Sequence, residues 1–106
     1  MITPARPRNV GKRRTITGID GQKIHLVVED EIVRPQKGSK HKKLIYFQKL
    51  RFEEDNRLEY RFTYYMLGVK PGARNRWVFG QYSLMIPAHD LSALLREARS
   101  RGWGGV

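Results

Sequence analysis

Cysteine is absent from this chain of 106 residues. Its absence excludes disulfides, thiolate zinc sites, iron–sulfur clusters and cysteine nucleophiles. No apolar run approaches the roughly 18 residues that a membrane-spanning helix needs. The opening stretch MITPARPRNVGKRR also lacks the apolar core of a secretory signal. We therefore expect a protein of a reducing compartment, the cytoplasm, with no membrane partner.

Motifs of catalysis and of cofactor binding are missing as well. The three histidines, His25, His41 and His89, are far apart and lack the spacing of paired metal ligands. No serine lies in a Gly-x-Ser-x-Gly elbow, and the glycines between residues 68 and 80 fit no phosphate-binding loop. The sequence therefore predicts a protein that is not an enzyme, with no cofactor, no metal and no small-molecule substrate.

Basic residues are plentiful, and they are unevenly distributed. The formal net charge is +11. Residues 1–14 and 34–43 each contribute +5, residues 70–76 contribute +3, and the rest of the chain sums to −2. Each basic segment is rich in proline, glycine or serine, which is typical of tails and loops. A nearly neutral body with three basic segments indicates a polyanionic partner, most often nucleic acid and less often an anionic membrane.

The length of the chain fits one domain. We expect residues 1–14 to form a flexible basic arm and residues 15–106 to form a single α+β domain. Apolar residues alternate on both sides of Asp20-Gly21, a favoured pair for a tight turn. This pattern predicts a hairpin of two short strands over residues 15–29.

Three longer strands are expected after a polar loop over residues 30–43. Alternating apolar and polar residues mark strands over residues 44–53, 58–69 and 77–87. Short turns join them, so neighbours in the chain should pair as antiparallel neighbours in the sheet.

The final segment, PAHDLSALLREARSRGW, predicts a helix. Leu91, Leu94, Leu95 and Ala98 recur at helical spacing and form one apolar stripe. Proline and aspartate suit its start, and arginines followed by glycine suit its end. The expected fold class is α+β: a twisted antiparallel sheet in the order β-β-loop-β-β-β-α, with one C-terminal helix packed on one face.

Alternation divides the side chains of the long strands between two faces. The face expected under the helix carries Leu44, Tyr46, Leu50, Phe52, Leu58, Tyr60, Phe62, Tyr64, Met66, Val78, Tyr82, Leu84 and Ile86. The opposite face is expected to carry Ile45, Phe47, Lys49, Arg51, Arg61, Thr63, Tyr65, Trp77, Phe79, Gln81 and Ser83. A face open to water usually carries mostly polar residues, whereas aromatic rings stack on unpaired bases and cations pair with phosphates. This face favours a single-stranded partner, because a duplex groove calls for a free helix or ribbon.

The segment YSLMIPAHDLSALLREA, at residues 82–98, ends a strand with proline and begins a helix. With the sheet before it, the region from residue 44 to residue 101 resembles the single-stranded-DNA-binding transcriptional regulators of the PC4, PUR and Whirly group. In that group a curved antiparallel sheet with a basic and aromatic open face precedes a helix, and dimers are usual. The resemblance implies a role in transcription regulation and a binding face formed by Lys49, Arg51, Arg61, Tyr65, Trp77 and Phe79. The extra N-terminal hairpin and the long loop over residues 30–43 depart from the simplest form of that fold.

Three hypotheses follow. The first is a non-enzymatic protein, homodimeric and compatible with the nucleoid, that binds single-stranded DNA or RNA through the basic-aromatic face and the basic loops. The second is a homodimeric protein-interaction module whose aromatic face is the subunit interface. The third is a metal-dependent nuclease that uses the acidic cluster at residues 29–31 or the one at residues 53–55. For the first hypothesis the candidate nucleic-acid-binding residues are Lys40, Lys42, Lys43, Phe47, Lys49, Arg51, Arg61, Tyr65, Lys70, Arg74, Arg76, Trp77 and Phe79.

Overall fold

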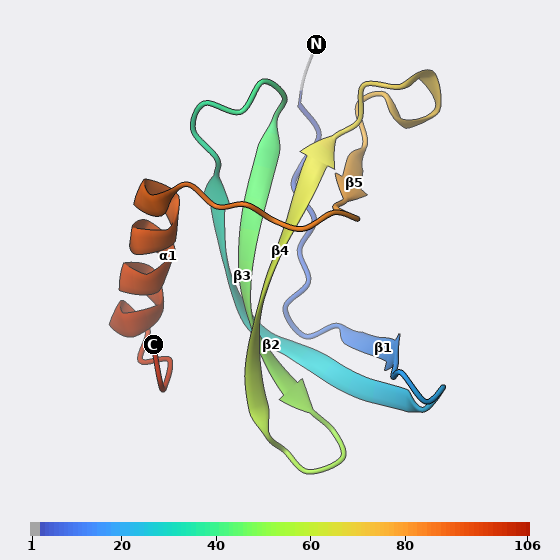
Figure 1. The fold of residues 1–106 in the computed structure, drawn as a ribbon, viewed down its shortest axis with the longest axis vertical. Helices are drawn as coiled ribbons and strands as arrows, with labels where there is room; N and C mark the ends of the chain where they lie inside the picture. The colour runs from blue at the N-terminus through green and yellow to red at the C-terminus, as the bar shows by residue number, and fades with distance from the viewer. Residues whose placement is uncertain (1–2) are drawn as a thin grey trace.

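A computed structural model describes residues 3–106 of the chain. Its elements are β1 (Arg13–Thr17), β2 (Lys23–Pro35), β3 (Lys43–Phe52), β4 (Leu58–Leu67), the 3-10 turn η1 (Pro71–Ala73), β5 (Trp77–Phe79) and α1 (Ala88–Ser100). The strands form one antiparallel sheet in the order β1-β2-β3-β4-β5. The sheet is strongly curled, and α1 covers one of its faces (Figure 1). The expected α+β class and the order of the elements are confirmed.

The last strand is shorter than expected, because the chain leaves the sheet at Gly80. The amide nitrogen of Gly80 donates to the carbonyl oxygen of Tyr64 at 2.8 Å, and a side chain at Gly80 would meet the Tyr64 ring at 2.2 Å. This close approach requires glycine. Residues 80–87 then cross the sheet as an irregular segment that leads to α1 (Figure 1).

A β-bulge at Glu29 divides β2 into two halves. The register of β2 with β3 shifts between Val28 and Asp30. Val28 lies opposite Leu50 before the bulge, whereas Ile32 lies opposite Phe47 after it. Because one extra residue inverts the alternation of side chains, even-numbered residues of β2 point to opposite faces on the two sides of the bulge.

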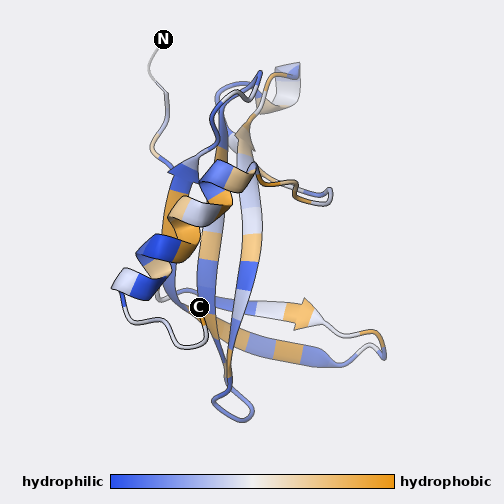
Figure 2. Cartoon of the chain, turned by 60° about the vertical axis from the view of Figure 1, so that its left-hand side comes forward, coloured by the Kyte–Doolittle hydropathy of each residue, from blue (hydrophilic) through white to orange (hydrophobic). Residues whose placement is uncertain are grey.

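The core of the domain lies between α1 and the sheet, on the side that we call the helix face. Leu94, Ala98 and Trp103 are buried there, and the apolar stripe of α1 turns toward the strands (Figure 2). The buried residues of this core are Ile32, Ile45, Phe47, Leu94, Ala98 and Trp103. No helix within residues 3–106 has the length and apolar character needed to cross a membrane.

The opposite side, which we call the arm face, holds a second and smaller core. Its buried residues are Leu26, Val28, Leu50 and Phe52. The segment before β1, residues 3–12, which we call the arm segment, runs across this face (Figure 1). The hydroxyl of Tyr46 donates to the carbonyl oxygen of Pro7 at 2.6 Å. Two residues of the expected arm, Arg13 and Arg14, belong to β1.

The expected division of β3 between the two faces is wrong. Arg51 pairs with Leu58 across the β3–β4 turn. Odd-numbered residues of β3 therefore share a face with even-numbered residues of β4, and Phe47 lies opposite Phe62. Both rows of β3 are largely apolar, so alternation alone could not reveal which row lies under the helix.

Candidate nucleic-acid interface

Acidic residues are missing from two long stretches of the chain, residues 32–52 and 60–89. These stretches include the β2–β3 loop and the β4–β5 loop, which lie at the same end of the sheet (Figure 1). At the other end, cations are paired with carboxylates: Arg13 Nε lies 2.7 Å from Glu53 Oε1, and Arg57 Nη1 lies 3.0 Å from Asp55 Oδ2. The end of the sheet that carries the β2–β3 and β4–β5 loops, which we call the loop end, is thus the part of the molecule with the greatest excess of positive charge.

A groove of about 460 Å³, which we call the lysine groove, lies at the loop end. It is lined by Thr3, Pro35, Gln36, Ser39, Lys40, His41, Lys42, Lys43, Leu44 and Trp77. The indole nitrogen of Trp77 donates to the carbonyl oxygen of Pro4 at 3.0 Å, and Lys42 donates to the hydroxyl of Thr3. The groove therefore combines three lysines with an aromatic ring that the arm segment holds in place.

A second hollow of about 210 Å³, which we call the arginine cavity, lies on the arm face. It is lined by Asn9, Arg14, Thr15, Ile16, Val28, Gln48, Arg61, Tyr65 and Phe79. These residues come from all five strands and from the arm segment, because the curl of the sheet brings β1 and β5 to the same hollow. The rings of Tyr65 and Phe79 meet edge to face at 5.4 Å between centroids. Two cations and two aromatic rings thus share one small space.

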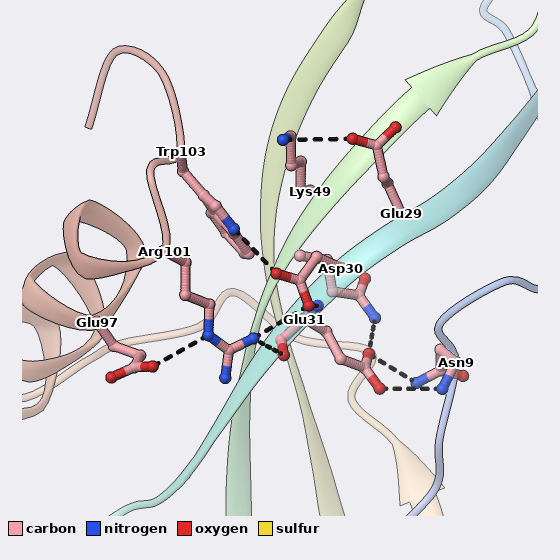
Figure 3. Close-up of polar contacts among 9 residues, drawn as sticks. Asn9, Glu29, Asp30, Glu31, Lys49, Glu97, Arg101 and Trp103 are labelled. Carbon is pink, nitrogen blue, oxygen red and sulfur yellow. Dashed lines mark hydrogen bonds and ion pairs between the residues drawn. The ribbon is translucent and has the colours of Figure 1, made fainter.

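A chain of hydrogen bonds fixes the polar side of the arginine cavity. Arg61 donates through Nε and Nη2 to the side-chain oxygen of Gln48, at 3.0 and 2.7 Å. Gln48 donates to Glu31 at 2.9 Å, and Glu31 also accepts bonds from the backbone and side chain of Asn9 (Figure 3). Arg14 donates to the side-chain oxygen of Asn9 at 3.1 Å. The network ties β1, β2, β3 and β4 to the arm segment.

Arg61 is the electrostatically costly member of this network. Burial lowers its pKa below the ordinary value, Arg14 lowers it further, and Tyr65 and Glu31 act in the opposite direction. An arginine remains protonated in proteins despite such a shift. Gln48, which accepts its hydrogen bonds, is uncharged, so an anionic ligand in the cavity would compensate the desolvated charge.

Three of the expected site residues lie on the other side of the sheet. Phe47 is 2 % exposed and stacks on Phe62 in the core, with centroids 4.2 Å apart. Lys49 Nζ lies 3.3 Å from a carboxylate oxygen of Glu29 (Figure 3), and Arg51 is paired with the same carboxylate. Burial alone would raise the pKa of Glu29, but its hydrogen bonds to Arg51 and Lys49 outweigh that effect and lower it. Phe47, Lys49 and Arg51 therefore do not belong to the arm face, which corrects their assignment.

The remaining expected residues gather around the two hollows and the loop end. Lys40, Lys42, Lys43 and Trp77 line the lysine groove, and Arg61, Tyr65 and Phe79 line the arginine cavity. The amino group of Lys43 also lies over the Tyr64 ring, 4.8 Å from its centroid. Lys70, Arg74 and Arg76 are exposed in the β4–β5 loop, where Arg76 donates to the carbonyl oxygen of Gly72 at 2.6 Å.

Asn9, Arg14 and Gln48 are among the residues of the arginine cavity that sequence reasoning missed. Arg14 was counted only as part of a basic arm, and its position follows from the pairing of β1 with β2. Gln48 carried a usable signal, because it is a polar residue within an apolar row of β3. It is 2 % exposed, and a buried amide of this kind needs hydrogen-bond partners.

Both acidic clusters are engaged by donors from the same chain. Asp30 accepts hydrogen bonds from the guanidinium of Arg101 and from the indole nitrogen of Trp103, each at 3.0 Å (Figure 3). In the other cluster, a hydrogen bond from Arg13 lowers the pKa of Glu53. Within residues 3–106 no three or more histidine or carboxylate side chains are grouped so that they could hold a metal ion.

The chain matches no protein-family model, no curated protein and no solved structure. The resemblance to the PC4, PUR and Whirly group therefore stays a prediction. The binding face that it implies is divided in this fold, because Lys49 and Arg51 lie on the helix face, opposite to the row that contains Tyr65 and Phe79.

Proposed function

We propose that this protein binds single-stranded DNA or RNA along its arm face and does not act as an enzyme. The observation that carries the proposal is the arginine cavity, in which Arg14 and Arg61 share a hollow with Tyr65 and Phe79. Aromatic rings give an unpaired base a stacking partner worth roughly 1–3 kcal/mol, and arginines pair with phosphates. No carboxylate is among the described residues that line the cavity.

The lysine groove extends this surface toward the loop end. Trp77 and Phe79 lie on the same side of β5, two residues apart, and each lines one of the two hollows. A single strand that follows β5 would place successive bases near these rings and its phosphates near Lys40 and Lys42. A rigid duplex fits less well, because its bases are already stacked and cannot enter the hollows.

Binding is tested with labelled single-stranded DNA, single-stranded RNA and duplex of equal length over a range of salt concentrations. We expect both single strands to bind more tightly than the duplex, with affinity that falls steeply as salt rises. Bound oligonucleotide should quench the fluorescence of Trp77, and Trp77→Phe should remove this part of the quenching. Absence of binding even at low salt, or a preference for duplex, would contradict the proposal.

Two neighbouring arginines provide a matched control for the cavity. Arg14 lines the cavity, whereas Arg13 points to the other face and pairs with Glu53. Arg14→Ala should weaken binding and reduce the salt dependence by about one phosphate contact, while Arg13→Ala should do neither. Equal losses in the two variants would mean that net charge, and not the cavity, attracts the nucleic acid.

A further inference from the structure

A separate groove of about 320 Å³, which we call the apolar groove, lies beside β5 at the edge of the sheet. It is lined by His41, Tyr64, Met66, Leu67, Gly68, Val69, Lys70, Ala73, Val78, Phe79, Gly80, Gln81 and Tyr82. Most of this lining is aliphatic or aromatic, unlike the lysine groove and the arginine cavity. No carboxylate is among the described residues that form it.

Large apolar side chains around this groove are exposed to solvent. Tyr82 is 83 % exposed, Val69 58 %, Phe79 48 % and Val78 40 %. Isolated apolar residues on a surface are ordinary, but a group around one concave site is typical of an interaction surface. In the described chain, β5 pairs with β4 alone, so its outer edge has no neighbouring strand.

The floor of the apolar groove is fixed before any ligand binds. The ring of Tyr64 lies against Gly80, where an added Cβ would be 2.2 Å from it. The hydroxyl of Tyr64 accepts a hydrogen bond from the amide of Tyr82 at 3.2 Å. Gly68 is equally close to Ala73, whose carbonyl oxygen would lie 2.1 Å from an added Cβ. A preformed floor of this kind reduces the ordering cost of binding.

The charge around the groove is of one sign. Lys70 lines it, and the amino group of Lys43 lies over the Tyr64 ring that forms its floor. Arg74 and Arg76 are exposed on the loop beside it, and residues 60–89 contain no acidic side chain. An apolar floor with a cationic rim is complementary to a ligand that is both apolar and acidic.

We infer that the apolar groove binds a short acidic segment of a partner protein through that segment's apolar side chains. Leucine or phenylalanine anchors would fill the groove over Tyr64 and Val78, while aspartates and glutamates would face Lys70 and the loop cations. A second copy of this chain is a poor occupant, because each copy carries a net charge of +11 and the cationic rims would repel each other. The inference does not depend on the proposed binding of nucleic acid.

The test uses a fluorescent peptide of about twelve residues in which leucine and phenylalanine are interspersed with aspartate and glutamate. Two control peptides separate the contributions: one has serine in place of the apolar residues, and the other has lysine in place of the acidic ones. We expect measurable anisotropy changes only with the first peptide, and weaker binding at high salt. Equal binding of the serine peptide would overturn the inference, as would absence of binding by the first peptide.

Variants of the full chain locate the site. Tyr82→Ala should weaken peptide binding about tenfold, as the loss of an anchoring aromatic contact does. Met85→Ala is its matched control, because Met85 is 81 % exposed but does not line the groove. Lys70→Glu should likewise weaken binding, whereas Arg99→Glu on the exposed side of α1 should not. Equal effects within either pair would overturn the assignment.

Two further readouts distinguish other occupants. Sedimentation of the protein alone would reveal a dimer, and a dimer that Tyr82→Ala dissociates would mean that a second copy fills the groove. A loss of oligonucleotide affinity in Tyr82→Ala would mean that the groove belongs to a nucleic-acid surface. Either result would overturn the inference. Arg14→Ala leaves the apolar groove intact, so failure of the nucleic-acid proposal and failure of this one can be told apart.

Discussion

The helix face and the arm face belong to the same curled sheet and are both apolar near their centres, yet they are covered in different ways. On the helix face, Leu94, Ala98 and Trp103 pack directly on the strands and are buried. On the arm face, Tyr46 and Trp77 reach the covering segment through hydrogen bonds to backbone carbonyl oxygens. The first cover is a row of side chains, and the second is mainly a polar backbone.

This difference determines how completely the space over each face is filled. A helix covers a sheet with interdigitating side chains, which fill the space between the two layers. An extended segment held by a few polar contacts leaves spaces beside it, and the lysine groove and the arginine cavity lie there. Phe47 and Trp103 on the helix face are therefore core residues, whereas on the arm face Tyr46 and Phe52 are buried but Tyr65 and Phe79 line a hollow.

The largest expected effect compares one phenylalanine from each face. Phe47→Ala removes a ring that is 2 % exposed, so the free energy of unfolding should fall by about 3–5 kcal/mol. Phe79→Ala removes a ring that is 48 % exposed and should cost below about 1 kcal/mol. Urea denaturation of the two variants measures both values. Similar losses would mean that the two faces are equally important as core.

The next effect concerns the ion pair that joins α1 to β2 on the helix face. Arg34 Nε lies 2.7 Å from Asp90, which is 1 % exposed. Arg34→Met leaves a buried carboxylate without this partner and should destabilise the fold by about 3 kcal/mol. The double variant Arg34→Met, Asp90→Leu should recover much of the loss, as thermal unfolding can show. If the double variant were no more stable than the single one, the unpaired charge would not be the cause.

The next prediction compares the affinity for an oligonucleotide after two cations are removed from the lysine groove or from the helix face. The double variant Lys40→Ala, Lys42→Ala removes two lysines of the lysine groove and should weaken oligonucleotide binding about tenfold, or about 1.4 kcal/mol. Lys49→Ala, Arg51→Ala removes the same amount of charge from the helix face, where both cations pair with Glu29. Fluorescence titrations should show little change for this second pair. Comparable losses would indicate attraction by total charge.

The smallest effect concerns the hydrogen bond that holds the arm segment to the sheet. Tyr46→Phe removes the donor to Pro7, which should cost about 1 kcal/mol near neutral pH. Burial, together with Glu31 and Tyr65, raises the pKa of Tyr46 from 10.0 to about 12, against the opposing effect of Arg6. Because the raised pKa belongs to the folded state, this contribution is complete below pH 10 and is lost as the pH rises through 12.

Unfolding measurements on wild type and Tyr46→Phe at several pH values can follow this loss. The advantage of wild type should be constant up to about pH 9 and should shrink above pH 10. A difference between the two proteins that did not change with alkaline pH would mean that the neutral hydroxyl does not hold the arm segment.

The order of the elements could be predicted from the sequence but not all of their bounds, because β2 runs to Pro35 where a loop was expected from residue 30. The helix was recognisable from the stripe formed by Leu91, Leu94 and Ala98, and the strand order followed from short turns. The face of β3 could not be predicted, because Ile45 and Tyr46 are adjacent and both are completely buried. Only the register of the β3–β4 turn decides which of them meets the helix.

Sequence reasoning placed the site residues of β4 and β5 on one face correctly, but it did not place those of β1 and β3 correctly. Arg61, Tyr65 and Phe79 lie together because alternation along β4 and the pairing of Tyr65 with Phe79 place them on one face. Phe47 was assigned wrongly because its position depends on a register that no local pattern reveals. Arg14 joins the site only through the curl of the whole sheet, which brings β1 near β5.

The bulge at Glu29 reverses which face of the sheet the even-numbered side chains of β2 point to. Before the bulge, the even-numbered residues Leu26 and Val28 belong to the small core of the arm face. After the bulge, the even-numbered residue Ile32 belongs to the helix-face core. A single strand thus serves two opposite cores while keeping one simple alternation in its sequence. A β2 of the same length without the bulge would turn Ile32 toward the arm face, and the helix-face core would lose its contribution from that strand.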